Sequence, residues 1–226
     1  MQKGVWIILL FFVGFASCVE NEADSENPNV SENVFGDFFY PYDTIPKIYV
    51  YRDVVNGLEE QFHRVFAIND SEGKHIVVEI YTNDGRIIEA LNYNLDSLDI
   101  IDYMVVDRRQ EQTKAELFKN KLIPNDKKST ASFAARFSGI SDSTLFLKEI
   151  DREYGSTKNI DVMGKKVNTT IFNDHLRVTL FNPFTKMEDE REGESVNYFA
   201  TGYGLVEWHN VDKSIHYRLE KIISQD

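Results

Sequence analysis

Apolar or aromatic residues alternate with polar and charged ones over most of the chain from Phe35 onward. The alternation is clear in 48–53, 62–68 and 75–81, and each of these segments is followed by a run rich in Asn, Asp and Gly. Successive side chains of a strand point to opposite faces, so a period of two is typical of a sheet with one buried face. Asn-Gly and Asp-Gly between such segments are typical of hairpins. The sequence therefore predicts an antiparallel meander.

The same pattern extends into the middle of the chain. Alternation in 100–107 and 113–123 predicts two further strands, and Pro124 to Lys128 predicts a break after them. Segment 130–138 fits either a strand or a short helix, and we favour the strand. Segment 145–154 is equally ambiguous in its periodicity.

Turn signals follow this ambiguous segment. Gly155-Ser156 and the segment 161–166 are typical of turns and favour additional hairpins. The polar, mostly acidic stretch from Lys186 to Glu194 predicts a long loop that projects from the sheet.

The C-terminal part contains a strand pattern from Val196 to Trp208 that is interrupted by Gly202 and Gly204. Glycines inside a strand allow a bend or a bulge, which a curling sheet requires. Residues 215–222 predict the last strand. Residues 35–226 are therefore expected to form one all-β domain, a strongly curved sheet or half-barrel with at most one or two short helices.

The N-terminus carries Lys3, an apolar run from Val5 to Phe15, and then Cys18, which is the only cysteine. The run is too short to cross a bilayer, which needs about twenty apolar residues in a helix. This pattern predicts a cleaved export signal over residues 1–17.

The sequence Phe15-Ala16-Ser17-Cys18 resembles the lipobox of bacterial lipoproteins, although Phe15 stands where that motif usually has Leu. The resemblance implies that Cys18 carries acyl chains, which make the membrane a partner and place the protein in the cell envelope, at the outer membrane. An ordinary signal that leaves a free thiol at Cys18 is the alternative. The Tyr198 to Val206 stretch also resembles bacterial lipoproteins that contain a curved antiparallel sheet.

Residues 18–34 contain five acidic residues and no basic one, so they are expected to form a flexible tether. Their acidic cluster resembles a signal that directs lipoproteins of the Bacteroidota to the cell surface. A plain solvated spacer explains it equally well, so the face of the membrane stays open. Three tripeptides resemble the O-glycosylation sequon of that phylum, and they would be modified at Thr44, Ser97 and Ser143.

The net charge of −12 disfavours nucleic acid as a partner, because phosphate binding needs a basic face. The sequence contains no hydrolase elbow, phosphate loop or zinc-protease motif, so no catalytic residue and no cofactor is predicted. His209 and His216 flank a probable turn and are the best metal candidates, together with Glu207 or Asp212. Surface histidines without a metal are the commoner case.

Aromatic side chains concentrate in two places. One set, near the C-terminus, could contact a sugar or an acyl chain, and it consists of Tyr198, Tyr203, Trp208 and Tyr217. The other is Phe35 to Tyr42, beside the tether. The alternative that we favour is that Phe35 to Tyr42 plugs the open edge or the end of the sheet and that the C-terminal rings belong to the core.

These patterns together predict a lipid-anchored envelope protein with a non-enzymatic binding or structural domain, whose ligand or protein partner stays open, as does its oligomeric state. Two alternatives remain. The layout resembles the lipoprotein-localisation carriers in topology, which implies a carrier of lipid or another hydrophobic ligand in a concave face. A hydrolase of envelope polymers would need converging acids or histidines, for which Glu207, His209 and His216 are the nearest candidates.

Overall fold

The computed structural model describes residues 33–106, 111–138 and 144–225, which belong to one compact unit. Within these ranges the unit contains thirteen strands and one 3-10 helix, η1 (Gly36–Phe38). The strands are β1 (Lys47–Asp53), β2 (Gln61–Asp70), β3 (Gly73–Tyr81), β4 (Ile87–Asn94), β5 (Ile100–Val106), β6 (Gln112–Lys114), β7 (Glu116–Asn120), β8 (Thr130–Ser138), β9 (Leu145–Val162), β10 (Lys165–Asn182), β11 (Met187–Ala200), β12 (Gly204–Asn210) and β13 (His216–Ser224). Among the described residues no helix is long and apolar enough to cross a membrane. The predicted signal, Cys18 and Ser143 lie outside these ranges.

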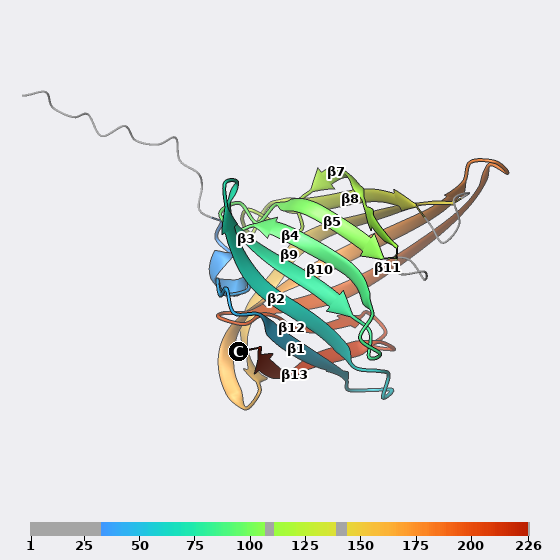
Figure 1. Ribbon diagram of the computed structural model, residues 1–226. Helices are drawn as coiled ribbons and strands as arrows, with labels where there is room; N and C mark the ends of the chain where they lie inside the picture. Colours follow the sequence, from blue (N-terminus) through green and yellow to red (C-terminus); the bar gives the residue numbers. More distant parts are fainter. Residues whose placement is uncertain (1–32, 107–110, 139–143, 226) are drawn as a thin grey trace, which may run out of the picture. The chain divides into compact units, whose positions relative to one another are not determined.

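All thirteen strands form one antiparallel sheet, as the alternation predicts. Its order is β6-β5-β4-β3-β2-β1-β13-β12-β11-β10-β9-β8-β7, so neighbours in the sheet are neighbours in the chain except at the β1–β13 pair. That pair joins the first strand to the last one, and Lys47 lies opposite Ser224 in it. The predicted all-β meander is confirmed (Figure 1).

The sheet curls until its two edges approach each other. The edge strands β6 and β7 are separated in the chain by Ala115 alone. Ala115 donates its backbone N–H to the carbonyl of Tyr103 in β5 at 2.8 Å, and Asp99 forms an isolated bridge with Lys121 just beyond β7. The predicted strong curvature is therefore confirmed, while the single strand expected over 113–123 is divided at Ala115.

Bulges contribute to this curvature. A register shift interrupts six of the twelve strand pairings, and each shift increases the local twist. The turn expected at Gly155-Ser156 is wrong, because both residues lie within β9 at one of these bulges. Ile171 pairs with Ser156 and Phe172 with Tyr154, which leaves Gly155 as the extra residue. A Cβ there would lie 3.1 Å from Asn173 Nδ2 and 3.3 Å from the carbonyl oxygen of Ile171, so a glycine fits this close approach.

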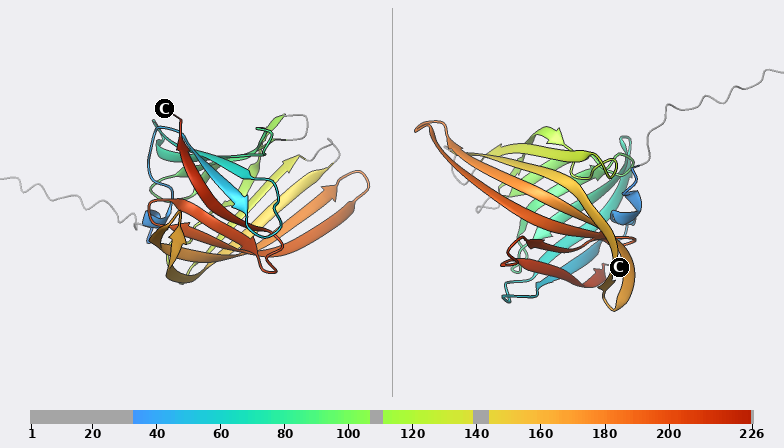
Figure 2. Two further views of the ribbon diagram at one scale, coloured as in Figure 1. Left: turned by 90° about the horizontal axis from the view of Figure 1, so that it is seen from below. Right: turned by 180° about the vertical axis from the view of Figure 1, so that it is seen from behind.

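The long polar loop expected from Lys186 to Glu194 is wrong, because Met187 to Glu194 belong to β11. This part of β11 pairs with the end of β10, and the β10–β11 hairpin extends beyond the neighbouring strands (Figures 1 and 2). Its side chains are exposed on both faces, so the sequence lacks the apolar alternation that marks the other strands. Arg177 lies within 3.8 Å of the Glu190 carboxylate and 3.1 Å of the Glu192 carboxylate across this hairpin. The predicted strand over 130–138 is confirmed as β8.

Gly202 and Gly204 also differ from the prediction. They do not bend a continuous strand but flank the tight turn between β11 and β12, both with positive φ. Gly204 has a second role, because a Cβ at this position would lie 2.3 Å from Cδ1 of Tyr40. The Tyr40 ring therefore lies directly against the backbone of this turn.

The segment from Phe35 to Tyr40 fills one end of the curled sheet, seen at the left of Figure 1 beside η1. Phe35, Phe39 and Tyr40 are at most 4% exposed. Their rings pack on rings from several strands, among them Phe35 on Phe172 at 5.0 Å and Phe39 on Tyr93 at 4.9 Å between centroids. The expected plug is confirmed for these three residues, whereas Tyr42 is 40% exposed.

The contact between Gly204 and Tyr40 gives a direct test of the plug. Gly202→Ala places a side chain at φ +77 in open space and should lower the free energy of unfolding by about 1 kcal/mol. Gly204→Ala has the same backbone cost at φ +78 and also displaces Tyr40, so it should cost about 2 kcal/mol more. Urea unfolding of both variants measures the difference, and equal losses would show that Tyr40 does not stabilise this end.

Candidate functional site

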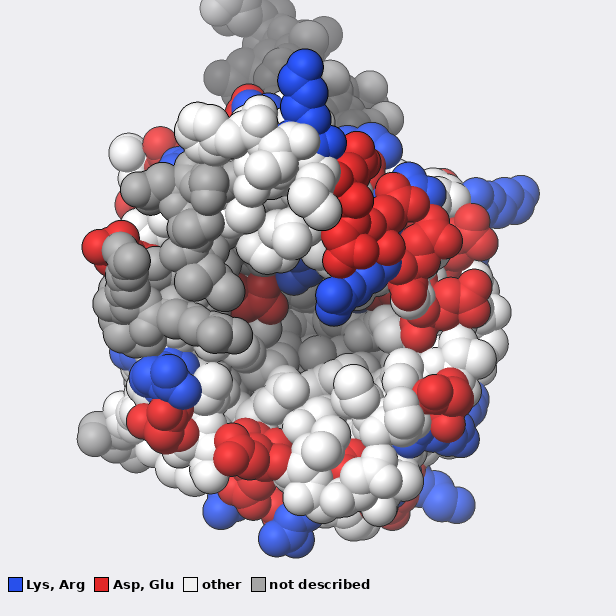
Figure 3. Space-filling view, turned by 90° about the vertical axis from the view of Figure 1, so that its right-hand side faces the viewer, with Lys and Arg blue, Asp and Glu red and all other residues white. Residues whose placement is uncertain are grey.

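The end of the curled sheet opposite the plug is open. Strand β5 runs toward this open end, which lies at the right of Figure 1. Its antiparallel partner β4 therefore begins at the open end, and β9 begins there too. Viewed from there, the surface is hollowed at its centre, and charged side chains of both signs surround the hollow (Figure 3). The first residues of β4 and β9 therefore lie toward this end of the sheet.

Three polar side chains meet across this end of the interior. Lys148 Nζ on β9 donates to Glu89 Oε2 on β4 at 3.0 Å and to the Tyr103 hydroxyl on β5 at 3.2 Å. Tyr103 donates its hydroxyl to the same Glu89 oxygen at 2.6 Å. β4 and β9 are far apart in the sheet order, so the ion pair joins opposite walls of the curl.

The electrostatics of this cluster keep its ion pair charged. Burial opposes the charge on Lys148, but the Glu89 carboxylate raises the pKa of Lys148 above its ordinary value. Burial also opposes the charge on Glu89, yet Lys148 and the Tyr103 hydroxyl hold the Glu89 pKa below its ordinary value. Burial raises the pKa of Tyr103, so its phenol stays protonated. The cluster has no net charge and combines one anionic acceptor with one cationic donor.

His63 on β2 lies on the same inner face and is 4% exposed. Its ring packs against those of Tyr51 and Trp208, with centroids 4.5 and 5.6 Å away, and these two rings also contact each other at 4.8 Å. Neither ring nitrogen has a hydrogen-bond partner. Burial lowers the pKa of His63 to about 4, against the opposing influence of Glu89, so the imidazole is neutral at physiological pH. We refer to His63, Glu89, Tyr103 and Lys148 as the interior polar cluster.

The four predicted ligand-contact rings are divided between different environments. Trp208 stacks on Tyr217 at 4.9 Å, and Tyr217 is buried and donates its hydroxyl to the carbonyl of Glu59. Tyr203 lies half-buried in the β11–β12 turn, and Tyr198 is half-buried with its hydroxyl 3.3 Å from His209 Nε2. The structure does not bring the four rings together on one exposed face. Trp208 alone of the four contacts the interior polar cluster.

His209 and His216 do face each other across β12 and β13, as the turn between them predicts, with ring centroids 5.1 Å apart. Their nitrogens are engaged elsewhere. His216 Nε2 lies 2.8 Å from Glu207 Oε1, and His209 Nδ1 lies 2.9 Å from the backbone oxygen of Asn210. Glu207 also accepts from Arg218 at 3.0 Å. In the part of the chain that the structure describes, no group of three His, Cys, Asp or Glu side chains is placed to hold a metal ion.

Two of the three sequon residues lie within the described ranges. Thr44 is exposed in a bend before β1. Ser97 is half-buried, and its hydroxyl donates to Asn94 Oδ1 and accepts from the Asp99 N–H, both at 3.3 Å. The Ser97 hydroxyl thus has a structural role in a turn, and Thr44 is the more accessible of the two.

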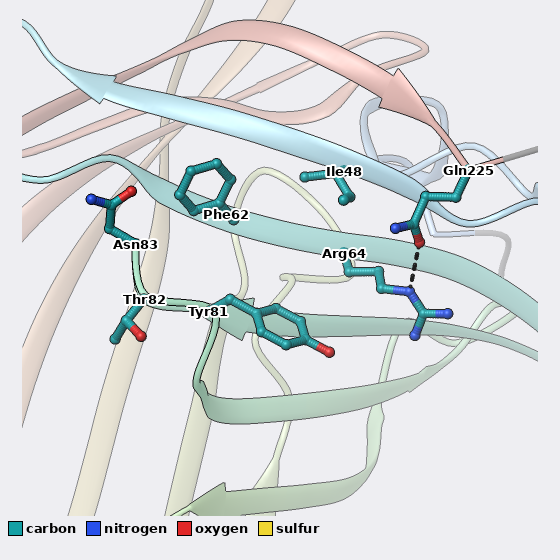
Figure 4. A pocket seen from close by; sticks show the side chains of 8 residues that line it. Ile48, Phe62, Arg64, Tyr81, Thr82, Asn83 and Gln225 are labelled. Carbon is teal, nitrogen blue, oxygen red and sulfur yellow. Dashed lines mark hydrogen bonds between the residues drawn. The ribbon is translucent and has the colours of Figure 1, made fainter.

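A second hollow lies on the outer face of β1, β2 and β3 and has a volume of about 530 Å³ (Figure 4). Its lining includes Phe62, Arg64 and Tyr81. The Arg64 guanidinium is already bound to Glu79 Oε2 at 2.9 Å and to Gln225 Oε1 at 3.0 Å. The Arg64 cation is therefore paired within its own face, as Lys148 is in the interior.

Sequence analysis did not single out the interior polar cluster. Two of its members carry a signal, because they occupy positions in phase with core residues. Glu89 is in phase with Leu91 and Tyr93, and Lys148 is in phase with Ile150 and Arg152. A charged residue on the apolar phase of a strand is the pattern that would have revealed them.

The neutral, buried state of His63 predicts a specific loss of stability in acid. Its pKa is about 4 in the folded protein and near 6.5 in the unfolded chain, so the unfolded chain binds the proton first. Stability should therefore be unaffected above pH 6.5 and fall by up to about 3 kcal/mol as the pH drops to 4. His63→Phe should remove this part of the pH dependence in urea titrations, while His175→Phe at the surface should retain it. If the free energy of unfolding of His63→Phe fell between pH 6.5 and 4 as steeply as that of the wild type, His63 would not be the group responsible.

No protein-family model matches the chain, and no curated protein matches it in sequence. Among solved structures, a "putative lipoprotein" from Parabacteroides distasonis is similar with a TM-score of 0.51 and 12% identity, over 82% of this chain and 98% of that chain. A "putative exported protein with YmcC-like fold" from Bacteroides fragilis has a TM-score of 0.48 and 14% identity, over 82% and 99% of the two chains. The "hypothetical lipoprotein YmcC" from Escherichia coli has a TM-score of 0.37 and 9% identity, over 88% of this chain and 99% of that chain. The first similarity shows a shared fold.

Proposed function

We propose that this protein is a lipid-anchored, non-enzymatic protein of the cell envelope that binds a small ligand in the open end of its curled sheet. The observation that carries the proposal is the interior polar cluster at the hollow opposite the plug. A half-buried ion pair beside a buried imidazole without partners is costly in a core unless it serves recognition or structure.

The anchor is supported by the lipobox-like sequence that ends at Cys18. The similar fold of a protein described as a lipoprotein points in the same direction. Acyl chains on Cys18 would hold the protein at the outer membrane, and the acidic segment 18–34 would give the domain reach. The net charge of −12 favours a domain that projects into solvent and does not lie on anionic lipid.

Binding of a small ligand is favoured over transport of a long acyl chain. A lipid carrier needs a continuous apolar cavity, but Phe35, Phe39 and Tyr40 occupy one end of this interior. The other end presents a carboxylate and an ammonium group to the hollow. An acyl chain would bury these charges without forming any bond to them.

The same geometry favours binding over hydrolysis. A carboxylic acid that donates a proton in catalysis needs a raised pKa, as in glycoside hydrolases. The pKa of Glu89 is instead lowered, and Lys148 holds it ionised. The second acid–histidine group, Glu207 with His216, has its carboxylate bound to Arg218 as well, and the Glu207 pKa is also lowered.

Replacement of the anchoring residue gives the first test. Cys18→Ser should move the protein from the membrane fraction to the soluble fraction, because the acyl attachment point is lost. Ser17→Ala keeps a small residue in the lipobox-like sequence and should stay membrane-bound. The intact mass of the wild-type protein should include the acyl groups. Digestion of whole cells with an added protease shows on which face of the outer membrane the domain lies. Membrane retention of Cys18→Ser would exclude this anchor.

Native mass spectrometry of the protein purified from its own envelope tests the binding site. A small ligand should remain bound to the wild type and be lost from the double variant Glu89→Gln/Lys148→Met, which removes the ion pair without changing net charge. The matched control, Arg64→Met/Glu79→Gln, removes an ion pair of 2.9 Å on the outer face and should keep the ligand. A mass without ligand in the wild type would contradict the proposal, and a retained long-chain lipid would favour the carrier instead.

A further inference from the structure

The hollow on the outer face of β1, β2 and β3, which we call the outer groove, has the size of a small-molecule pocket, at about 530 Å³ (Figure 4). One wall is the β3–β4 turn at 82–85. Another is Gln225, whose backbone N–H donates to the carbonyl of Pro46 at 2.9 Å. Because the lining residues are half-buried or exposed, a ligand can reach the outer groove from solvent.

Two aromatic rings lie in the middle of the outer groove. Phe62 on β2 and Tyr81 on β3 are opposite each other in the strand register, and both are half-buried. In the described part of the chain neither of them stacks on another ring, unlike Tyr51 and Trp208, which contact each other at 4.8 Å. Ile48 on β1 adjoins them and extends the apolar surface. The two rings thus offer apolar area to a bound molecule.

Polar side chains lie at the two ends of the outer groove (Figure 4). Asn83 is at one end, and its amide has no hydrogen-bond partner among the described residues. Arg64 and Gln225 are at the other end, where Arg64 Nε donates to Gln225 Oε1 at 3.0 Å. The amide nitrogen of Gln225 has no partner within the same ranges. Both amides are therefore available to a ligand.

The charges in and beside the outer groove are paired. Arg64 bonds Glu79 at 2.9 Å, and Tyr81 donates its hydroxyl to the same carboxylate at 2.9 Å. In the adjoining turn, Arg86 Nε lies 2.6 Å from Asp84 Oδ2. A charged ligand would lose hydration there without gaining a counter-charge. An alkyl chain would cover the polar ends without bonding to them.

The ligand that fits has an apolar face for the rings and hydrogen-bonding groups for the two ends. A saccharide combines apolar C–H faces with hydroxyl groups that both donate and accept. We propose that the outer groove is a second binding site, which takes an uncharged saccharide with its C–H faces on Phe62 and Tyr81. Its hydroxyl groups bond the amides of Asn83 and Gln225 and the guanidinium of Arg64. The site is separate from the open end of the sheet, so the inference goes beyond the proposed function.

The test applies the full-length mature protein in detergent micelles to an array of neutral and charged glycans. At least one neutral glycan should bind, and its charged derivatives should bind more weakly. Phe62→Leu keeps an apolar floor but removes a ring, so it should weaken binding about tenfold. The matched control, Phe118→Leu, removes another exposed ring, on β7, and should bind like the wild type. In ¹H–¹³C NMR spectra of the wild type, the glycan should shift the methyl signals of Ile48 and leave those of the buried Ile76 unchanged.

The two double variants of the mass-spectrometry test separate this site from the proposed function. Glu89→Gln/Lys148→Met should bind the glycan like the wild type. Arg64→Met/Glu79→Gln should lose affinity for the glycan and keep the ligand of the open end. If only the first variant lost the glycan, the glycan would occupy the open end, which would reject the outer groove as its site and support the proposed function.

Other results would also overturn the inference. They are that no neutral glycan binds, that charged glycans bind best, that the bound glycan leaves the Ile48 signals unchanged, or that Phe62→Leu binds it like the wild type. Each of these concerns the outer groove alone. A ligand of the open end in the native mass spectra would still support the proposed function.

Discussion

The packing of the Phe35–Tyr40 segment into one end of the curled sheet is the interaction on which the rest of the structure depends. A sheet of thirteen strands whose two edges approach each other encloses an interior that side chains must fill. At the plugged end, rings from this segment pack on Tyr49, Tyr93 and Phe172. Three backbone hydrogen bonds tie its surroundings to distant parts of the sheet: Val34 to Asn125, Ala67 to Asp43 and Gly202 to Asp37. The segment thus holds several strands in their curled arrangement.

The interior changes character along its length. Close to the plug, the buried Arg152 forms a bidentate ion pair with Asp174 at 2.7 Å, and its guanidinium lies over Phe172 and Phe199. Asn197 supplies a further bond to Asp174, so the requirements of this buried pair are met by the protein itself. At the open end, Glu89 and Lys148 are each about a quarter exposed, and His63 has no partner. The bonds to Asp174 meet the needs of the buried charge of Arg152, whereas the nitrogens of His63 carry the cost of unsatisfied buried polar groups.

Several local features were predictable because they depend on neighbours in the chain. The Met163-Gly164 turn and the strand alternation follow from short-range signals, and so do most hairpins. The errors share a physical cause. Gly155 resembles a turn residue, but pairing with β10 keeps it in a strand as a bulge. The acidic residues 187–194 lack an apolar phase because both faces are in solvent, and only pairing with β10 makes them a strand.

The sequence by itself determined the all-β class, the order of hairpins and the aromatic segment that fills the core, since alternation and turn residues act over a few positions. It also carries the lipobox-like motif at Cys18, which is read as a linear pattern. Only the tertiary structure decided which polar side chains meet. Glu89 and Lys148 are 59 positions apart on strands that are not neighbours in the sheet, and they bond because the sheet curls. The bulges that contribute to this curvature depend on pairing between strands, so the chain can show that Glu89 and Lys148 share the apolar phase of their strands but not that they meet.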